Sequence, residues 1–290
     1  MRIFLTGATG FLGSRVLSFL SGHEVLCLSR RSEWRPKLAG VRSISGDLDD
    51  STTWQAELQQ FAPECCIHLA WTDLPNYSFS ACRANLDSSM RLVETVVTSG
   101  AKRIIVAGTC WEYGNASGAV KENQPIGDCG VFASTKHALR LMLESFAREA
   151  QIEARWVRIF FAYGPHQRIS ALIPQCHLAY LRGTQPAIRN PEAVQDFVYV
   201  DDVARGIVAI AEADAGSGIF NLGSGAPMSV AYVVNQVADH FHAPHPFMLP
   251  QSQSGFWADT SKISAVTGWR PQTSIESGIM ETLMELDRKQ

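Results

Sequence analysis

The first half of the chain alternates short apolar runs with longer stretches in which apolar residues recur every three or four positions. Short apolar runs are typical of buried strands, and the longer spacing indicates amphipathic helices. The expected strands cover residues 2–6, 24–28, 41–45, 65–70, 103–107 and 154–161. The expected helices cover residues 11–20, 52–61, 79–99 and 132–150. This alternation predicts an α/β fold with a doubly wound parallel sheet of the Rossmann type.

After about Gly164 the rhythm changes, because prolines separate much shorter elements. A helix over 203–211 and a strand over 219–222 still fit the sheet. We therefore expect two units that interleave along the chain. They are a dinucleotide-binding domain over residues 1–165, with 200–225 added to it, and a smaller substrate-binding region over 166–199 and 226–290.

Composition excludes several classes of protein. With 290 residues, 46% of them hydrophobic, the chain can bury a full core, and a formal charge of −3 argues against a dedicated nucleic-acid binder. No apolar run is long enough to span a membrane, so we expect a cytoplasmic protein. Seven cysteines without a C-x-x-C pair predict buried thiols. His240, His242 and His245 are spaced like metal ligands but lack suitable partners, so we predict no metal site.

A glycine-rich segment, TGATGFLG at residues 6–13, joins the first strand to the first helix. Such a turn lets a dinucleotide pyrophosphate approach bare backbone and the free N–H groups of a helix N-terminus. A purely structural glycine turn is the alternative. The expected cofactor contacts in this segment are Gly7, Thr9, Gly10, Phe11 and Leu12.

The end of the second expected strand favours one dinucleotide over the other. An NAD site usually has an acidic residue there, whereas this chain has Ser29, Arg30 and Arg31. Guanidinium groups can pair with a 2′-phosphate, so we predict NADP(H), with NAD(H) as the less favoured cofactor. The alternative is that these arginines are solvated surface residues. Asp47 and Leu48 are expected to border the adenine.

Ordered motifs extend along nearly the whole chain. They are TGATGFLG at 6–13, GDL at 46–48, HLAW at 68–71, GTCWEYG at 108–114, FASTK at 132–136, RIFFAYGPH at 158–166, QDFVYVDDVA at 195–204, NLGSG at 221–225, FWADTSK at 256–262 and GWRP at 268–271. This series resembles the extended short-chain dehydrogenase/reductase family, in its nucleotide-sugar epimerase, dehydratase and 4-ketoreductase branch. The resemblance implies a nicotinamide dinucleotide, an activated sugar, and a homodimer formed through the helices at 79–99 and 132–150. We expect Leu139 and Leu143 to be exposed at its seam.

Family members use a Ser or Thr, a Tyr and a Lys in catalysis. The resemblance assigns Thr109 and Lys136 to the first and last of these roles, but the tyrosine position is Phe132, which has no proton to donate. Three explanations stay open. The phenylalanine is an engineered replacement of tyrosine that traps a bound substrate, or the chain is a natural variant in which another residue serves as the acid. In the third, the protein has lost its catalytic activity and only binds ligand. Candidates for a relocated acid are Tyr77, Tyr163 and His166.

The resemblance also implies the other contacts. Further cofactor contacts fall on Leu69, Ala70, Trp71, Lys136 and Phe160. Substrate contacts fall on Trp71, Cys110, Trp111, Phe161, His166, Arg168, Arg189 and Gln195. Three groups that hold the diphosphate in relatives are replaced by Phe161, Gln195 and Leu249, and Arg168, Arg182 and Arg189 are candidate substitutes. Asn85 is either a support for the active-site backbone or a structural helix residue.

The residues after Thr109 narrow the reaction. Dehydratases of this branch place a carboxylate within two residues, but here Cys110 and Trp111 follow, and Glu112 is one place too late. A 3,5-epimerase would need its cysteine at position 111. The reaction that remains is NADPH-dependent reduction of a nucleotide-linked 4-keto-6-deoxy sugar. We expect Phe132 to impair catalysis of this reaction in the present sequence. The alternatives are a sugar 4-epimerase and a catalytically disabled NADP-binding protein.

Overall fold

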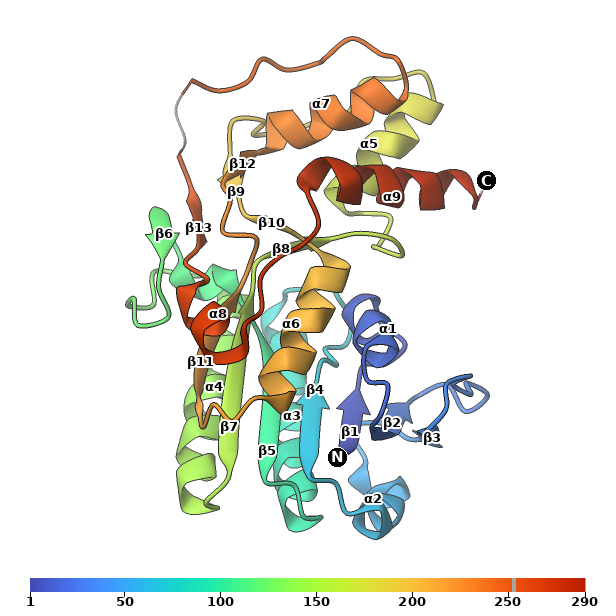
Figure 1. Ribbon diagram of the computed structural model, residues 1–290, viewed down its shortest axis with the longest axis vertical. Coiled ribbons are helices and arrows are strands. Elements are labelled where there is room, and N and C mark those ends of the chain that lie inside the picture. The colour runs from blue at the N-terminus through green and yellow to red at the C-terminus, as the bar shows by residue number, and fades with distance from the viewer. Residues whose placement is uncertain (252–253, 290) are drawn as a thin grey trace.

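The computed structural model describes residues 1–251 and 254–289. Its centre is a seven-stranded parallel sheet with the strand order β11-β7-β5-β4-β1-β2-β3 (Figure 1). The strands are β1 (Arg2–Thr6), β2 (Glu24–Ser29), β3 (Val41–Ser45), β4 (Cys65–His68), β5 (Arg103–Thr109), β7 (Glu153–Ile159) and β11 (Gly218–Leu222). The chain runs outward from β1 to β3 and then resumes on the other side of β1 with β4. This reversal is a topological switch point, where doubly wound sheets bind ligands at their carboxyl edge.

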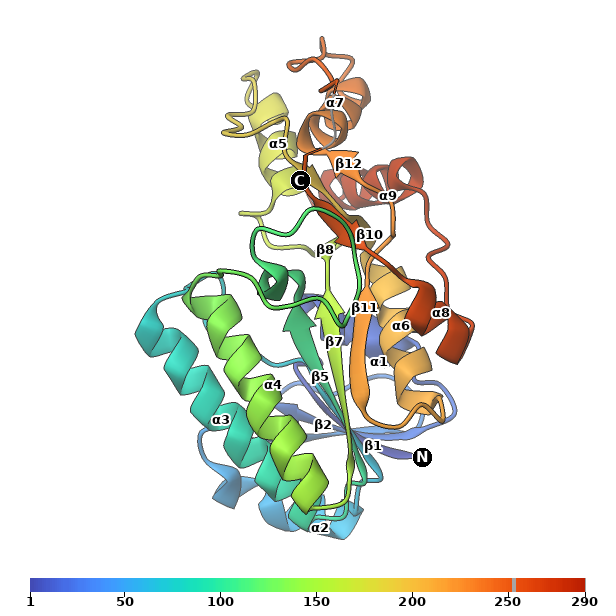
Figure 2. The same ribbon diagram turned by 90° about the vertical axis from the view of Figure 1, so that its left-hand side faces the viewer.

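Helices cover both faces of the sheet, which confirms the expected doubly wound α/β fold. Figure 2 shows α3 and α4 side by side on one face, with α6 on the other. One face carries α2 (Gln55–Phe61), α3 (Phe79–Thr98) and α4 (Val131–Glu149), and the other carries α1 (Phe11–Ser18), α6 (Val200–Glu212) and α8 (Ser261–Thr267). A separate apolar cluster fills each interface between helices and sheet.

The face of α4 that meets the sheet differs from the expected one. Leu139 and Leu143 are 0% and 1% exposed and belong to the core, so the expectation that they form an exposed seam is wrong. They share the inward face of the helix with Lys136. Leu141 and Met142, each 48% exposed, lie on the outer face instead.

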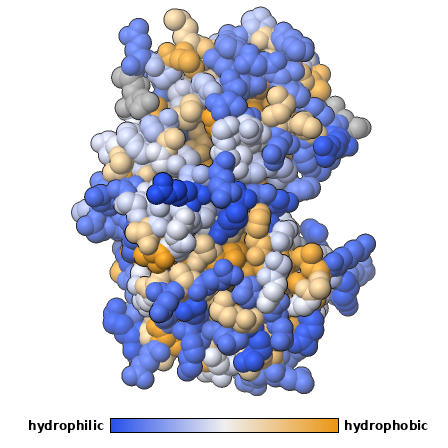
Figure 3. Space-filling view, viewed as in Figure 1, coloured by the Kyte–Doolittle hydropathy of each residue, from blue (hydrophilic) through white to orange (hydrophobic). Residues whose placement is uncertain are grey.

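The C-terminal part of the chain forms a smaller unit beyond the carboxyl edge of the sheet (Figure 1). Its helices are α5 (Leu172–Leu181), α7 (Val230–His240) and α9 (Ile275–Asp287), which surround a third apolar cluster. Short strand pairs connect it to the sheet: β8 (Phe161–Tyr163) with β10 (Phe197–Tyr199), β9 (Val194–Gln195) with β12 (Met228–Ser229), and β6 (Gly118–Val120) with β13 (Phe256–Ala258). The face seen in Figure 3 is mostly hydrophilic, with hydrophobic residues scattered between.

Two expected elements end differently from the prediction. The helix expected over 52–61 is divided into a 3₁₀ turn (Ser51–Thr53) and α2. Trp54 separates them because its indole turns into the core, 1% exposed, and donates to the Asp47 carbonyl at 2.8 Å. The strand expected over 65–70 ends at His68.

No helix within residues 1–251 and 254–289 is both long and apolar enough to cross a bilayer.

Candidate active site

The glycine turn after β1 brings two backbone segments into contact. Gly7 has φ +79°, and a Cβ on it would lie only 2.8 Å from the Ala70 nitrogen in the loop after β4. Gly10 is the N-cap of α1, which has neither a side-chain cap nor an acidic residue in its first turn. The first N–H groups of α1 therefore remain free to bind an anion, and the helix dipole favours negative charge there.

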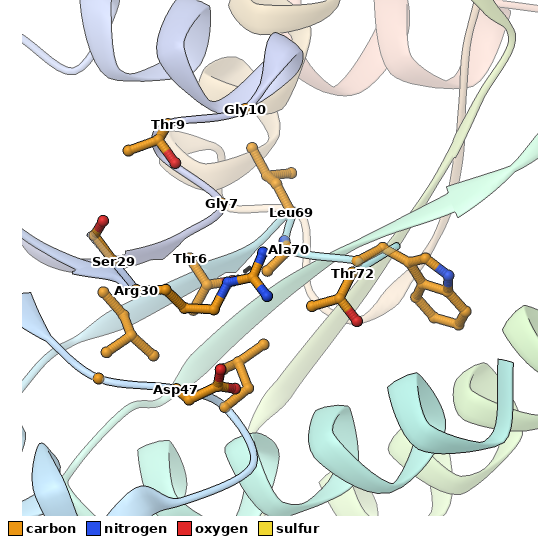
Figure 4. A pocket seen from close by; sticks show the side chains of 14 residues that line it. Thr6, Gly7, Thr9, Gly10, Ser29, Arg30, Asp47, Leu69, Ala70 and Thr72 are labelled. Atoms are coloured by element: carbon orange, nitrogen blue, oxygen red, sulfur yellow. Dashed lines mark hydrogen bonds between the residues drawn. The ribbon is translucent and has the colours of Figure 1, made fainter. Parts of the chain in front are cut away.

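A cavity of about 190 Å³ lies in front of this turn at the switch point (Figure 4). Its walls come from the carboxyl ends of β1, β2 and β4 and from the segment after β3. The lining residues are Thr6, Gly7, Thr9, Gly10, Leu28, Ser29, Arg30, Gly46, Asp47, Leu48, Leu69, Ala70, Trp71 and Thr72. The cavity thus brings together ten of the expected cofactor contacts.

The other expected cofactor contacts lie elsewhere. Arg31 is exposed, and its backbone nitrogen donates to the Ser29 hydroxyl at 3.1 Å. Phe11 lines a neighbouring cavity beside α1. Leu12 packs against the core, and Phe160 is 4% exposed within it.

Arg30 is the cation of the cavity wall. It is exposed, and Figure 4 shows its side chain extended across the cavity. It also lines an adjoining cavity with Ser45, Gly46, Asp47, Asp50 and Thr53. A guanidinium in this position can meet a phosphate on the adenosine ribose.

Thr109 ends β5 and begins a 3₁₀ turn (Cys110–Tyr113). Its hydroxyl accepts a hydrogen bond from the Trp111 nitrogen at 3.2 Å, and the Glu112 carboxylate accepts one from the Thr109 nitrogen at 3.1 Å. The Thr109 side chain also accepts from the backbone of Glu112, so Thr109 and Glu112 form a capping box. Because the Thr109 oxygen acts there as an acceptor, its own proton remains free to donate to a ligand.

Glu112 is fully buried, and the sequence analysis did not foresee its role. Besides Thr109, its carboxylate accepts from Trp156 Nε1 at 2.8 Å and from Arg158 Nε at 3.0 Å. The buried carboxylate thus links the backbone of the candidate catalytic threonine to two side chains of β7. The T-x-x-E spacing of a capping box was the signal that could have found it.

Lys136 reaches the site from the inward face of α4. It is 5% exposed, its ammonium donates to the Ala107 carbonyl at 2.8 Å, and it lies 3.8 Å from the centroid of a Trp71 ring. Burial lowers the pKa of Lys136 from 10.5 to about 7, against the opposing attraction of Glu112. The buried amine therefore loses its proton more readily than a solvent-exposed lysine does.

His68 connects the ends of two strands and a helix. One ring nitrogen lies 2.7 Å from the Thr6 hydroxyl and the other 3.0 Å from the Ser89 hydroxyl. Burial, followed by the charge of Lys136, lowers the pKa of His68 to about 3. The imidazole is therefore neutral at physiological pH and acts as a structural link.

Aromatic rings surround Phe132, which stands where the sequence motif leads us to expect a tyrosine. The ring centroid of Phe132 lies 5.0 Å from that of Tyr77, 5.4 Å from that of Trp71 and 5.8 Å from that of Trp111. Beside them lies a second cavity, of about 420 Å³. Its lining residues are Tyr77, Trp111, Gly114, Asn115, Asp128, Cys129, Gly130, Val131, Phe132 and Ala133.

Several expected substrate residues lie away from Phe132. Cys110 is 2% exposed and packs in the core, so the structure gives no support to a substrate contact there. Phe161 packs against Phe197. His166 lines the cavity beside α1 and lies 3.3 Å from Glu285. The remaining candidates are on the surface or in a short strand: Arg168, Arg182 and Arg189 are exposed, Leu249 is 54% exposed, and Gln195 lies in β9.

The histidines near the C-terminus pair with single carboxylates. His240 lies 3.0 Å from Asp287, and His245 lies 2.7 Å from Asp239. In the part of the chain that the structure describes, no three or more His, Cys, Asp or Glu residues group so as to hold a metal ion.

Comparison with known proteins identifies the family. Residues 3–223 match the model of the NAD dependent epimerase/dehydratase family. A probable UDP-glucuronate 4-epimerase of Rhizobium meliloti (strain 1021) is 24% identical over 96% of this chain and 95% of its own length. A dTDP-6-deoxy-L-talose 4-dehydrogenase (NAD(+)) of Aggregatibacter actinomycetemcomitans is 28% identical over 83% of this chain and 91% of its own length.

The fold of one solved structure matches that of this chain over its full length. MoeE5 in complex with UDP-glucuronic acid and NAD is 28% identical, has a TM-score of 0.85, and is matched over 100% of both chains. The family model alone covers most of this chain, including the glycine turn, Thr109 and Lys136. The chain therefore belongs to the NAD dependent epimerase/dehydratase family of enzymes, the extended short-chain dehydrogenases/reductases.

Proposed function

We propose that this chain is an NADPH-dependent reductase of a nucleotide-linked 4-keto-6-deoxy sugar. The observation that carries the proposal is Phe132, which stands beside the second cavity where the family has its acid/base. Epimerisation requires a group that removes a proton from a hydroxyl and later returns one, whereas reduction requires only a proton donor. Without a Lys-activated phenol the site lacks the base that the first half of an epimerisation needs, whereas another hydroxyl can supply the single proton that reduction needs.

The residues of the first cavity fit a nicotinamide dinucleotide. Free N–H groups at the start of α1 can receive the pyrophosphate. Trp71 Nε1 is buried without a hydrogen-bond partner among the described residues, which leaves a donor for a ligand between the glycine turn and Lys136. Arg30, with Arg31 next to it in the sequence, supports NADP(H) as the cofactor. Because the MoeE5 complex contains NAD, the affinity for NADP(H) is to be compared with the affinity for NAD(H).

The chain's own residues have distinct roles in the proposed reaction. The bound dinucleotide supplies the hydride. Thr109 donates a hydrogen bond to the sugar carbonyl oxygen and stabilises the negative charge that develops there. Lys136 orients the nicotinamide ribose and contributes positive charge near the reacting oxygen. The Trp71 ring now covers its ammonium, so we expect this ring to shift when the dinucleotide binds.

The relatives favour a second candidate, a sugar 4-epimerase. The protein from Rhizobium meliloti is named as a 4-epimerase, while that from Aggregatibacter is a 4-dehydrogenase. Both names place the reaction at position 4 of the sugar, and the two candidate reactions that we propose differ in the fate of the hydride. We further propose residues 166–199 and 226–290 as the substrate-binding region.

Single-turnover assays separate the candidates. The purified chain is mixed with NADPH or NADH and a dTDP- or UDP-linked 4-keto-6-deoxyhexose, and in a parallel sample with NAD⁺ and UDP-glucuronic acid. A reductase oxidises NADPH in step with loss of the ketone. Formation of the C4 epimer without net cofactor consumption would establish the epimerase instead. Dinucleotide binding with neither reaction would indicate a disabled enzyme.

We also propose a homodimer through the outer faces of α3 and α4. Phe79 on α3 is 72% exposed, and Leu141 and Met142 are the exposed apolar residues of α4. Glutamate at positions 141 and 142 should then give a monomer by light scattering at micromolar concentration. A parent chain that is itself monomeric would contradict the proposal.

A further inference from the structure

We propose that Tyr77 is the proton donor of this site and replaces the phenol that position 132 lacks. The inference rests on the proposed reductase function. It concerns a residue outside the family's Y-x-x-x-K motif, on the loop between β4 and α3.

The Tyr77 ring packs directly on the ring that occupies the family's tyrosine position. The centroids of Tyr77 and Phe132 are 5.0 Å apart with an interplanar angle of 51°, and those of Tyr77 and Trp111 are 5.6 Å apart. These separations are ordinary for packed aromatic pairs. Tyr77 therefore stands one ring away from position 132.

Tyr77 also faces the same open space as Phe132. Both line the cavity of about 420 Å³, together with Trp111. Tyr77 is partly exposed, whereas the other tyrosine considered as a relocated acid, Tyr163, is 2% exposed and donates to the Ile275 carbonyl. A protic group must reach the substrate oxygen to act as an acid, and of these two tyrosines it is Tyr77 that lines this cavity.

The loop that carries Tyr77 is anchored on both sides of it. Asn85 on α3 accepts from the Thr72 nitrogen at 2.7 Å and donates to the Thr72 carbonyl at 3.2 Å. Asn76 donates from its side chain to Asp73 at 2.8 Å. Ser78, the next residue after Tyr77, is the N-cap of α3. Asn85 thus supports the active-site backbone, and the ring of Tyr77 extends from a fixed main chain.

The C4 carbon accepts the hydride from the reduced nicotinamide, so the carbonyl π bond breaks and a C–H bond forms. The carbonyl oxygen takes the proton from the Tyr77 hydroxyl, which forms the product O–H bond. The nicotinamide is oxidised and the ketone is reduced to an alcohol. The resulting tyrosinate regains its proton from water.

The test uses the full chain and three variants: Tyr77→Phe, Phe132→Tyr and the double variant. Tyr77→Phe removes one oxygen and keeps the ring that packs on Phe132. The double variant is the internal control, because it removes the Tyr77 hydroxyl and returns a phenol at position 132. Each protein is assayed for single-turnover NADPH oxidation with dTDP- and UDP-linked 4-keto-6-deoxyhexoses.

We expect Tyr77→Phe to lower the single-turnover rate constant at saturating sugar by about 10²–10⁴-fold, the usual range for general acid catalysis, with little change in the sugar concentration that gives half of the maximal rate. Phe132→Tyr in that background should restore turnover. If Tyr77→Phe runs as fast as the parent, Tyr77 is not the donor. If only chains with Phe132→Tyr turn over, the reductase function stands and the Tyr77 assignment is wrong. If every chain is silent, the proposed function fails, and the Tyr77 assignment with it.

Discussion

Replacement of Lys136 by methionine should change how the stability of the ligand-free protein depends on pH. The ammonium is 5% exposed, and burial lowers its pKa from 10.5 to about 7. The unfolded chain therefore holds this proton more tightly than the folded chain. Between about pH 7 and pH 10.5 the unfolded state carries more protons at this site, so the free energy of unfolding rises with pH. Below pH 7 both states are protonated, and the full cost of burying the charge is present.

The size of the effect follows from the shift. Each pKa unit corresponds to about 1.4 kcal/mol, so raising the pH by two units within this window should relieve about 2–3 kcal/mol of the cost. Lys136→Met removes the charge and the hydrogen bond to Ala107 but keeps a chain of similar length. The variant should therefore gain most, relative to the parent, at about pH 6, and this gain should shrink by about 2–3 kcal/mol at about pH 9.

Urea unfolding of both proteins at the two pH values measures the difference. Lys121→Met is the control, because the Lys121 side chain is 68% exposed. It should shift stability equally at both pH values. If the stability difference between Lys136→Met and the parent stays constant with pH to within about 0.5 kcal/mol, the lysine is not buried as a strained charge and the reasoning is wrong.

Three other outcomes are expected. Arg30→Ala with Arg31→Ala should reduce the preference for NADPH over NADH about ten- to hundredfold, since charge-assisted hydrogen bonds contribute about 1.5–3 kcal/mol; unchanged Kd ratios in a fluorescence titration would contradict it. Glu112→Gln should destabilise the fold by about 3–5 kcal/mol in urea unfolding, because Arg158 is left buried without its counter-charge. Since the pKa of His68 is lowered to about 3, protonation favours the unfolded state as pH falls from about 6.5 to 3, so His68→Gln should flatten the loss of stability across that window.

The sequence predicted the parts of the fold that local pattern determines. Short apolar runs identified the seven sheet strands, and apolar residues at a spacing of three or four identified the long helices, with errors of a few residues at their ends. The glycine turn was predictable because few backbone contexts require Gly7 and Gly10 at that spacing before a helix. The other residues that line the cavity beside this turn were predictable because they follow neighbouring parallel strands, whose carboxyl ends meet at one edge of the sheet.

Long-range packing was not predictable in the same way. Apolar residues occur on both faces of α4, and only the assembled sheet shows that Leu139 and Leu143 face inward and Leu141 and Met142 outward. Trp54 interrupts an expected helix because the core behind β1 accepts its indole against Phe4. In each case the local pattern left two orientations open, and contacts made far along the chain selected one of them.

The candidate site combines both kinds of information. Sequence spacing alone shows that position 132 lacks a hydroxyl, because the expected tyrosine stands one helical turn before Lys136. It cannot show what stands beside that position, since Tyr77 is separated from Phe132 by more than fifty residues and reaches it from another strand–helix loop. The folded chain brings the two rings to 5.0 Å and opens both onto one cavity. This arrangement is the reason for our proposal that a loop at the carboxyl edge of the parallel sheet presents, from a neighbouring strand, the phenol that the motif lacks.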